Sequence, residues 1–280
     1  LAKLGRENDC LILPQIFHGG FRCPSLLTGV QPVSASEFII EAPNFEKPRA
    51  LKSDEIENIK SQFVKSAKMV VDQGLPGIEL HGANGYLFTQ FLSSQTNTRT
   101  DQWGGSLENR SRFLLETARD IRKQIGADKI LGVRISPENT KLIHGITIED
   151  MAVVCGELSK LGVDYISLSL WDAVKRPDQH VGKDLRDSTV VEYFRKVIPS
   201  DVAIFVSGKI WTHIEAQKAF DLGADFVALG ASGIANPRWP VEVWQNKQAP
   251  YRFPMTESQM SEIGVSPRFR KYLERWNYVK

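Results

Sequence analysis

The sequence contains few cysteines, and this scarcity excludes several kinds of site. Only Cys10, Cys23 and Cys155 occur in the 280 residues, and none belongs to a C-x-x-C pair. A structural zinc site or a cysteine-bound iron–sulfur cluster needs closely spaced thiolates, so we predict no metal site. An odd number of scattered cysteines is typical of reduced thiols, and we therefore expect a cytoplasmic protein.

The sequence also lacks long apolar segments and an excess of charge of one sign. No run approaches the roughly 18 apolar residues that a transmembrane helix needs, and the first ten residues contain no apolar signal core. The net charge of +2 is too small to favour nucleic acid or an anionic membrane as the main partner. Residue 1 is Leu rather than Met, so we expect an upstream segment in the translated protein.

Short apolar runs alternate with amphipathic stretches along the whole chain. The runs are rich in Ile, Val, Leu and Phe, which is typical of strands in a parallel sheet that helices cover. Six strands are predicted, over residues 10–17, 77–82, 130–136, 165–170, 202–208 and 226–230.

The intervening stretches follow helical periodicity and begin with residues that cap helices. The predicted caps are Ser53, Ser106, Thr147, Thr212 and Ser266, and the helices after the first four end near residues 73, 125, 161 and 222. Strand–helix alternation predicts repeated βαβ units. No Pro- or Ser-rich linker divides the chain, so residues 1–280 are predicted to form a single domain.

Periodicity alone does not separate an open doubly wound sheet from a closed barrel. The absence of G-x-G-x-x-G after the first strand weighs against a dinucleotide-binding sheet. A closed (β/α)8 barrel needs eight strands, and six would leave two open edges and an uncovered apolar interior. Either two strands lie upstream of residue 1, or the barrel interpretation is wrong.

The densest group of chemically useful side chains follows the second predicted strand, at His81, Asn84 and Tyr86. Catalytic side chains gather at the carboxyl ends of parallel strands. His81 and Asn84 can donate hydrogen bonds to a carbonyl oxygen, and Tyr86 can supply a proton, as a reaction through an enolate requires. From spacing alone, a helix-entry loop whose polar groups satisfy the backbone is at least an equal alternative.

Residues 77–113, GIELHGANGYLFTQFLSSQTNTRTDQWGGSLENRSRF, closely resemble the signature of the old yellow enzyme family of FMN-dependent NADH:flavin oxidoreductases. The motifs H-x-A-N-G-Y, Q-F-L, N-x-R-x-D, W-G-G-S and E-N-R-x-R-F occur in that order. PQIFH resembles the family's third strand, GVRIS its fifth and FVALG its eighth. The resemblance covers nearly the whole chain and implies a (β/α)8 TIM barrel of which about strands 3–8 are present here.

The resemblance implies a role for each matching residue. His81 and Asn84 would hold the carbonyl oxygen of the substrate over the flavin, and Tyr86 would protonate the α-carbon after hydride reaches the β-carbon. Gln15 would hydrogen-bond the pyrimidine edge of FMN. Arg134 would lie near flavin N1 and O2 and stabilise negative charge there, whereas an ion pair with a loop carboxylate is its structural alternative. The remaining signature residues would mostly fix the long loop and the next helix: Asn97, Arg99, Asp101, Glu108, Asn109 and Arg110.

The predicted phosphate site departs from the family pattern. Gly208 and Gly230 match the backbone phosphate site of FMN-binding barrels. The family usually has Arg after the second of these glycines, and this chain has Ala231. Because the charge-assisted contact of that Arg is missing, Lys209 is a candidate replacement, with a solvated surface lysine as the alternative.

These residues predict an NAD(P)H-dependent ene-reductase that uses FMN to reduce the C=C bond of α,β-unsaturated carbonyl compounds. The branch of the family with a cysteine-bound cluster is disfavoured by the cysteine spacing. The alternative is a flavin-free truncated barrel that acts as a binding or oligomerisation module, because barrel closure and FMN affinity should both suffer without two strands. Oligomeric state, including a homo-oligomer, and the choice between NADH and NADPH stay open.

Overall fold

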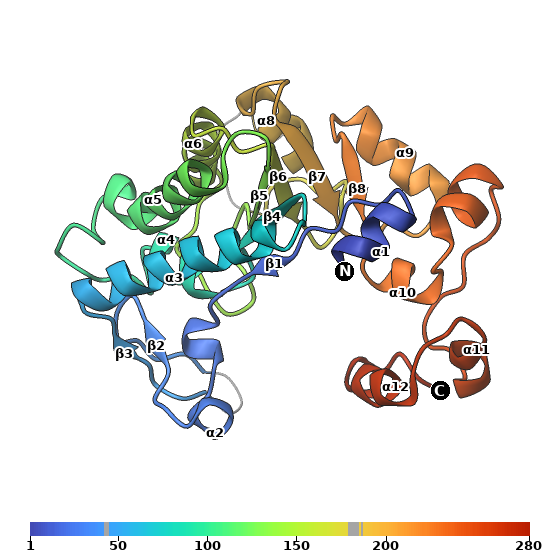
Figure 1. Cartoon of the computed structure of the whole chain (residues 1–280), viewed down its shortest axis with the longest axis horizontal. Helices are drawn as coiled ribbons and strands as arrows, with labels where there is room; N and C mark the ends of the chain where they lie inside the picture. Colours follow the sequence, from blue (N-terminus) through green and yellow to red (C-terminus); the bar gives the residue numbers. More distant parts are fainter. Residues whose placement is uncertain (42–44, 179–184, 186) are drawn as a thin grey trace.

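A six-stranded parallel sheet forms the centre of the computed structural model, which describes residues 1–41, 45–178, 185 and 187–280 (Figure 1). The strand order is β1-β4-β5-β6-β7-β8, and all five neighbouring pairs are parallel. The strands are β1 (Gln15–Ile16), β4 (Gly77–Gly82), β5 (Ile130–Ile135), β6 (Tyr165–Ser169), β7 (Ala203–Ser207) and β8 (Phe226–Ala228). The predicted number of strands and their parallel order are confirmed.

Helices connect the strands and lie along the outer side of the curved sheet, as Figure 1 shows. They are α3 (Ser53–Asp72), α5 (Leu107–Ile125), α6 (Ile148–Lys160), α8 (Val190–Val197) and α9 (His213–Asp221). Each is amphipathic and buries its apolar face, which in α3 consists of Ile56, Phe63 and Ala67. This repeated strand–helix arrangement is that of a TIM barrel.

Shorter elements surround this framework. Before α3 lie α1 (Ala2–Glu7), a 3-10 turn at Gly20–Arg22, α2 (Ser25–Thr28) and the parallel pair β2 (Val33–Ser34) and β3 (Arg49–Ala50). After β4 comes α4 (Leu87–Leu92), and after β8 come α10 (Ala231–Ala235), a π-helix at Pro240–Gln245, α11 (Glu257–Glu262), α12 (Pro267–Leu273) and a 3-10 turn at Glu274–Trp276.

The arc of strands does not close into a barrel within the described residues. β1 and β8 are the two edges of the sheet, and each pairs with a neighbour on one side only. An eight-stranded barrel would need two more strands between these edges. The open edges agree with the strand count predicted from the sequence.

Side chains alternate between the two faces of the sheet, and the two faces differ in chemistry. The face toward the helices is apolar, as at Ile78 and Leu80 of β4, which are fully buried. The inner face combines polar residues with aromatic rings, and Phe205 stacks on Phe226 with ring centroids 4.5 Å apart. Phe226 remains 51% exposed, so part of the inner face is uncovered.

Two local expectations differ from the structure. The first strand, predicted over residues 10–17, has ladder pairing only at Gln15–Ile16, because this edge segment meets β4 only there and Pro14 has no N–H to donate. Ser53 is not the cap of α3 but its first residue. Lys52 is the cap, and its backbone N–H donates to Glu55 Oε2 at 2.9 Å.

The other predicted caps are confirmed, since the side chains of Ser106, Thr147, Thr212 and Ser266 each accept a backbone N–H of the first helical turn. The C-terminal segment has a small core of its own. Leu273 is buried in a small separate cluster with Met255 and Met260. Phe269 and Trp276 are exposed.

Candidate active site

The three predicted catalytic residues lie at the carboxyl end of β4 and in the turn that follows it. His81 is the next-to-last residue of β4. Tyr86 directly precedes α4, whose six residues are all buried. Between them, Asn84 and Gly85 both adopt left-handed backbone conformations, with φ of 59° and 78°. Asn tolerates this region better than most residues, so the tight turn suits the sequence Asn-Gly.

The turn brings His81 and Tyr86 into contact. Their ring centroids are 4.8 Å apart in an edge-on arrangement. Phe17, from the segment after β1, packs against Tyr86 at 5.1 Å and against His81 at 6.4 Å. The three rings therefore fix the position of the Tyr86 phenol relative to the imidazole.

The environment of His81 keeps its imidazole neutral. Burial, followed by the positive charges of Arg134 and Arg22, lowers the pKa of His81 to about 4. A neutral imidazole has one N–H donor and one acceptor nitrogen. Its Nδ1 atom is buried and has no hydrogen-bond partner among the described residues. A buried polar atom of this kind calls for a partner from a bound molecule or water.

Asn84 is oriented by two hydroxyl groups from neighbouring strands. Its backbone N–H donates to Ser136 Oγ at 2.9 Å, and its Oδ1 accepts from Ser169 Oγ at 3.1 Å. Because the carbonyl oxygen of the amide is engaged in this way, the NH2 group is the part that can donate to another molecule.

Arg134 lies on β5, directly opposite His81 in the strand register. Its Nη2 atom donates to Ser169 Oγ at 2.9 Å and to Ser207 Oγ at 3.3 Å. Burial lowers the pKa of Arg134, and the negative charge of Glu79 opposes that effect. The Nε atom is buried and unpartnered within the described part of the chain.

Gln15 lies on the inner face as well, beside Glu79 on the adjacent strand. Its Nε2 atom donates to Glu79 Oε1 at 2.5 Å. Glu79 also interacts with Tyr165, because burial, the charge of Glu79 and a hydrogen bond to it all raise the pKa of that phenol. The predicted flavin-ring residues Gln15 and Arg134 therefore both border the carboxylate of Glu79.

The four predicted phosphate-site residues lie at the same end of the sheet, after β7 and β8, which pair at Ser207 and Ala228. Gly208 has φ of 134°, and a Cβ there would lie 2.7 Å from the backbone nitrogen of Asp172, so the position requires glycine for packing. The ammonium of Lys209 is 71% exposed and pairs with Asp172 at 3.3 Å. Gly230 and Ala231 begin α10, with open space around Gly230.

The loop residues of the family signature form structural bonds, as predicted. Asn97 Nδ2 donates to the carbonyls of Phe91 and Trp103, at 2.7 and 2.8 Å. Arg99 donates to the carbonyls of Ala35 and Leu51, and Arg110 to that of Leu92 and to Asp150.

Arg22 and the three serines of the site are not among the residues predicted from the sequence. The serines have a visible signal, because each one is the last or next-to-last residue of a predicted strand: Ser136, Ser169 and Ser207. Three hydroxyls at the same end of adjacent parallel strands must lie close together. Arg22 has no such signal, since its position depends on how the turn after β1 folds over Tyr86.

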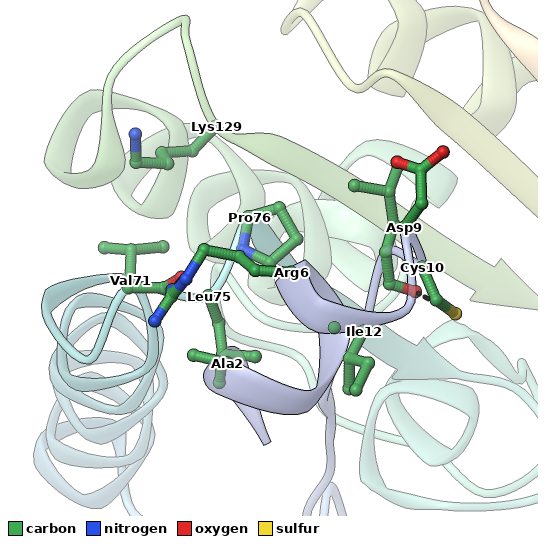
Figure 2. Close-up of a pocket in the computed structure, with 12 residues that line it drawn as sticks. Ala2, Arg6, Asp9, Cys10, Ile12, Val71, Leu75, Pro76 and Lys129 are labelled. Carbon is green, nitrogen blue, oxygen red and sulfur yellow. Dashed lines mark hydrogen bonds between the residues drawn. The ribbon is translucent and has the colours of Figure 1, made fainter.

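A cavity of about 410 Å³ lies at the opposite end of the sheet (Figure 2). α1 forms one wall with Arg6, and the segments before β4 and β5 contribute Leu75, Pro76 and Lys129. Because catalytic residues of such folds gather at the carboxyl ends of the strands, this cavity at the amino ends is separate from the site.

Neither a metal site nor a bilayer-spanning helix is present among the described residues. No group of three or more His, Cys, Asp or Glu side chains is arranged to hold a metal ion. No helix combines the length and the apolar character needed to span a bilayer.

Residues 1–249 match the model of the NADH:flavin oxidoreductase / NADH oxidase family. The probable NADH-dependent flavin oxidoreductase YqiG of Bacillus subtilis is 31% identical over 252 residues, which are 89% of this chain and 66% of that relative. Among solved structures, the old yellow enzyme homologue from Zymomonas mobilis has a TM-score of 0.77 at 25% identity and covers 96% of this chain. The chain covers 75% of that structure. Morphinone reductase in complex with tetrahydroNAD has a TM-score of 0.75 at 27% identity. It covers 92% of this chain, and this chain covers 71% of it.

The parallel α/β arc, with its polar residues at the carboxyl ends of the strands, belongs to the TIM-barrel class. The chain belongs to the NADH:flavin oxidoreductase / NADH oxidase family, of which the old yellow enzymes are members. It spans 66% of the Bacillus relative and between 24% and 38% of three longer relatives.

Proposed function

We propose that this chain forms the flavin- and substrate-binding part of an FMN-dependent ene-reductase, which uses NAD(P)H to reduce the C=C bond of α,β-unsaturated carbonyl compounds. The observation that supports this most directly is the grouping of His81, Asn84 and Tyr86 at one strand end. There, an unpartnered imidazole nitrogen, an amide NH2 and a phenol lie around one turn.

The polar groups on the inner face of the sheet support the binding of a flavin ring. The buried Nε of Arg134 needs an acceptor, and the pyrimidine edge of FMN offers several. Gln15 and Arg134 would hold that edge, with Arg134 favouring negative charge on the ring. Gly208, Lys209, Gly230 and Ala231 would hold the phosphate, and this role requires Lys209 to exchange Asp172 for the phosphate oxygens.

When bound, FMN supplies the hydride that reaches the β-carbon of the substrate. His81 and Asn84 donate hydrogen bonds to the carbonyl oxygen, where negative charge develops, and each such donor is worth about 10²–10³ in rate. The O–H of Tyr86 gives its proton to the α-carbon, and general acid catalysis contributes roughly 10²–10⁴. The substrate thus gains one hydride and one proton across its C=C bond.

The open sheet edges lead to a second part of the proposal. We infer that an additional segment supplies two strands between β8 and β1 and so completes the barrel. These strands would cover the exposed ring of Phe226 and saturate the backbone groups of both edges.

The same edges favour the alternative function, a flavin-free module that uses its unpaired strands and exposed inner face to bind another chain. The two candidates differ in one simple property. A flavin oxidoreductase takes up FMN and shows its visible absorption spectrum, whereas the module stays colourless.

The test begins with the absorption spectrum of the purified protein before and after FMN is added. NADH or NADPH is then added under argon, followed by 2-cyclohexenone. The proposal predicts a bound flavin that bleaches with the nicotinamide and recovers with the enone. A protein that never binds FMN supports the alternative. Bleaching without recovery in enone would show a flavin oxidoreductase with a different electron acceptor.

Tyr86→Phe tests the role of the phenol. The rate at which the enone reoxidises the flavin should fall by about 10²–10⁴, because the proton donor is lost. Stopped-flow absorption of the prereduced protein measures this rate. Tyr272→Phe, in the exposed part of α12, is the matched control and should reoxidise at the wild-type rate. Equal rates for both variants would remove Tyr86 from the mechanism.

A cytoplasmic location and the choice of nicotinamide stay predictions.

A further inference from the structure

Arg22 reaches the catalytic turn from outside it. It is the last residue of the 3-10 turn at Gly20–Arg22, and its guanidinium carbon lies 4.8 Å from the centroid of the Tyr86 ring. Its Nη1 atom donates to the backbone carbonyl of Asn84 at 2.6 Å. A cation over an aromatic face and a hydrogen bond to the turn hold the guanidinium beside two of the three proposed catalytic residues.

The charge of Arg22 is not neutralised within the described part of the chain. No carboxylate there lies within ion-pair distance of it, whereas Lys175 and Lys209, which follow β6 and β7, pair with Glu138 and Asp172. Arg134 adds a second positive charge, and both arginines act on His81. The catalytic turn therefore combines a positive potential with an exposed guanidinium that is only partly engaged.

We propose that Arg22 makes this site selective for unsaturated carbonyl compounds that carry a carboxylate group. This inference depends on the proposed ene-reductase function and specifies its substrate class. A guanidinium has five N–H donors in a planar fork that fits a carboxylate, and the hydrogen bond to Asn84 uses one of them.

The geometry places the carboxylate at a defined point of the substrate. A carbonyl oxygen bound by His81 and Asn84 directs the reacting carbons toward Tyr86, because Tyr86 must reach the α-carbon. Arg22 lies over the Tyr86 ring, so a carboxylate joined to the C=C bond can reach it while the carbonyl stays in place. The guanidinium thus adds a third contact that neutral enones cannot make.

The experiment compares two substrates that differ in one charge, trans-4-oxo-2-pentenoate and its methyl ester. Both carry the same enone, and only the acid can pair with Arg22. The ratio of kcat/KM for acid to ester is measured for the FMN-loaded protein and for Arg22→Gln. The ratio should fall at least tenfold in Arg22→Gln and remain closer to wild type in Arg22→Lys, which retains the charge but not the fork.

Arg119→Gln, on the outer surface of α5, removes the same charge far from the site and should leave the ratio unchanged. A ratio in Arg22→Gln within twofold of wild type would overturn the inference. Circular dichroism checks that the Arg22 variants are folded.

A binding measurement separates this inference from the proposed function. Isothermal titration of the oxidised, FMN-loaded protein with acid or ester involves no turnover. If neither compound reoxidises the flavin, the ene-reductase proposal fails, and titration still decides the role of Arg22. Selective loss of acid affinity in Arg22→Gln would support carboxylate binding, and equal affinity in both proteins would exclude it.

Discussion

Individual hydroxyl groups organise the site at the residue scale. Ser169 contacts both Asn84 and Arg134, so one side chain links a proposed catalytic residue to a proposed flavin residue. Ser136 and Ser207 extend this set to the neighbouring strands. Such hydroxyls orient amide and guanidinium groups without adding charge, so the charges of the site come from Arg22, Arg134 and Glu79.

The lowered pKa of His81 predicts a pH-dependent loss of stability. With a folded pKa of about 4 and an unfolded pKa near 6.5, the unfolded chain binds more protons between these values. The contribution of neutral His81 is therefore fully present above pH 6.5 and is lost as the pH falls toward 4. In His81→Asn, which does not titrate, this part of the loss should be absent.

Urea unfolding at pH 7.5 and pH 4.5 measures the effect. The free energy of unfolding should fall more in the wild type than in His81→Asn, by on the order of 1–3 kcal/mol. Because all other titrating groups are shared, they cancel in the comparison. Equal losses in the two proteins would mean that the imidazole is solvated enough to titrate normally.

At the scale of elements, the start of α3 depends on a carboxylate rather than on a hydroxyl. Glu55 accepts from the backbone N–H of Lys52 and forms two hydrogen bonds with Arg49 of β3. These contacts, led by the hydrogen bonds to Arg49, lower the pKa of Glu55 to about 2. The carboxylate therefore joins the helix to the small β2–β3 ladder.

Removal of this carboxylate should destabilise the protein more than removal of the nearby hydroxyl. Glu55→Ala loses the cap and the pair, and we expect a cost of about 1–2 kcal/mol in the free energy of unfolding. Ser53→Ala should cost less than about 0.5 kcal/mol, because Ser53 forms no cap hydrogen bond. Urea denaturation of both variants at pH 7 provides the comparison, and a larger effect for Ser53→Ala would restore the serine as the functional cap.

At the scale of the whole molecule, stability should decrease from the centre of the sheet to its edges. β4, β5 and β6 have neighbours on both sides, and their helix-facing side chains are fully buried. β1 has two residues and β8 has three, and Phe226 is half exposed. Few backbone bonds and little buried apolar area favour local opening.

Hydrogen exchange followed by mass spectrometry tests this gradient. Amides of β1 and β8 should exchange at least tenfold faster than those of β4 to β6 in the protein with open edges. If a further segment completes the barrel, its presence should slow exchange at both edges together. Uniform protection across the six strands would contradict the open-edge architecture.

The sequence predicted the framework well because its signals are local. Apolar runs located all six strands, and four of five predicted caps are the observed ones, since a Ser or Thr before a helical stripe is a short-range feature. The prediction for Ser53 was wrong because the helix begins one residue earlier, where Glu55 accepts the backbone N–H of the cap residue Lys52. The first strand was predicted to be longer than it is. Its length depends on where it pairs with β4, and the composition of the segment does not reveal that.

The turn after β4 could be predicted in part, and the resemblance of residues 77–113 supplied most of the proposed roles. The structure brings the rings of His81 and Tyr86 into contact, with Asn84 in the turn between them. It also shows contacts that no local pattern contains: Arg22 over Tyr86 spans 64 positions of the chain, and Ser169 to Asn84 spans 85. Tertiary folding determines such pairs, so a single sequence does not reveal them.

The alternation of side chains along the strands has a consequence for how this protein can change. Binding chemistry and packing are assigned to different residues, one peptide unit apart, as with His81 and Leu80. Substitutions on the inner face can therefore alter ligand preference while the helix-facing rows keep the scaffold intact. Arg22, to which we assign the carboxylate preference, lies in a turn outside the strands. Substitutions at this position should therefore change substrate choice with little loss of stability.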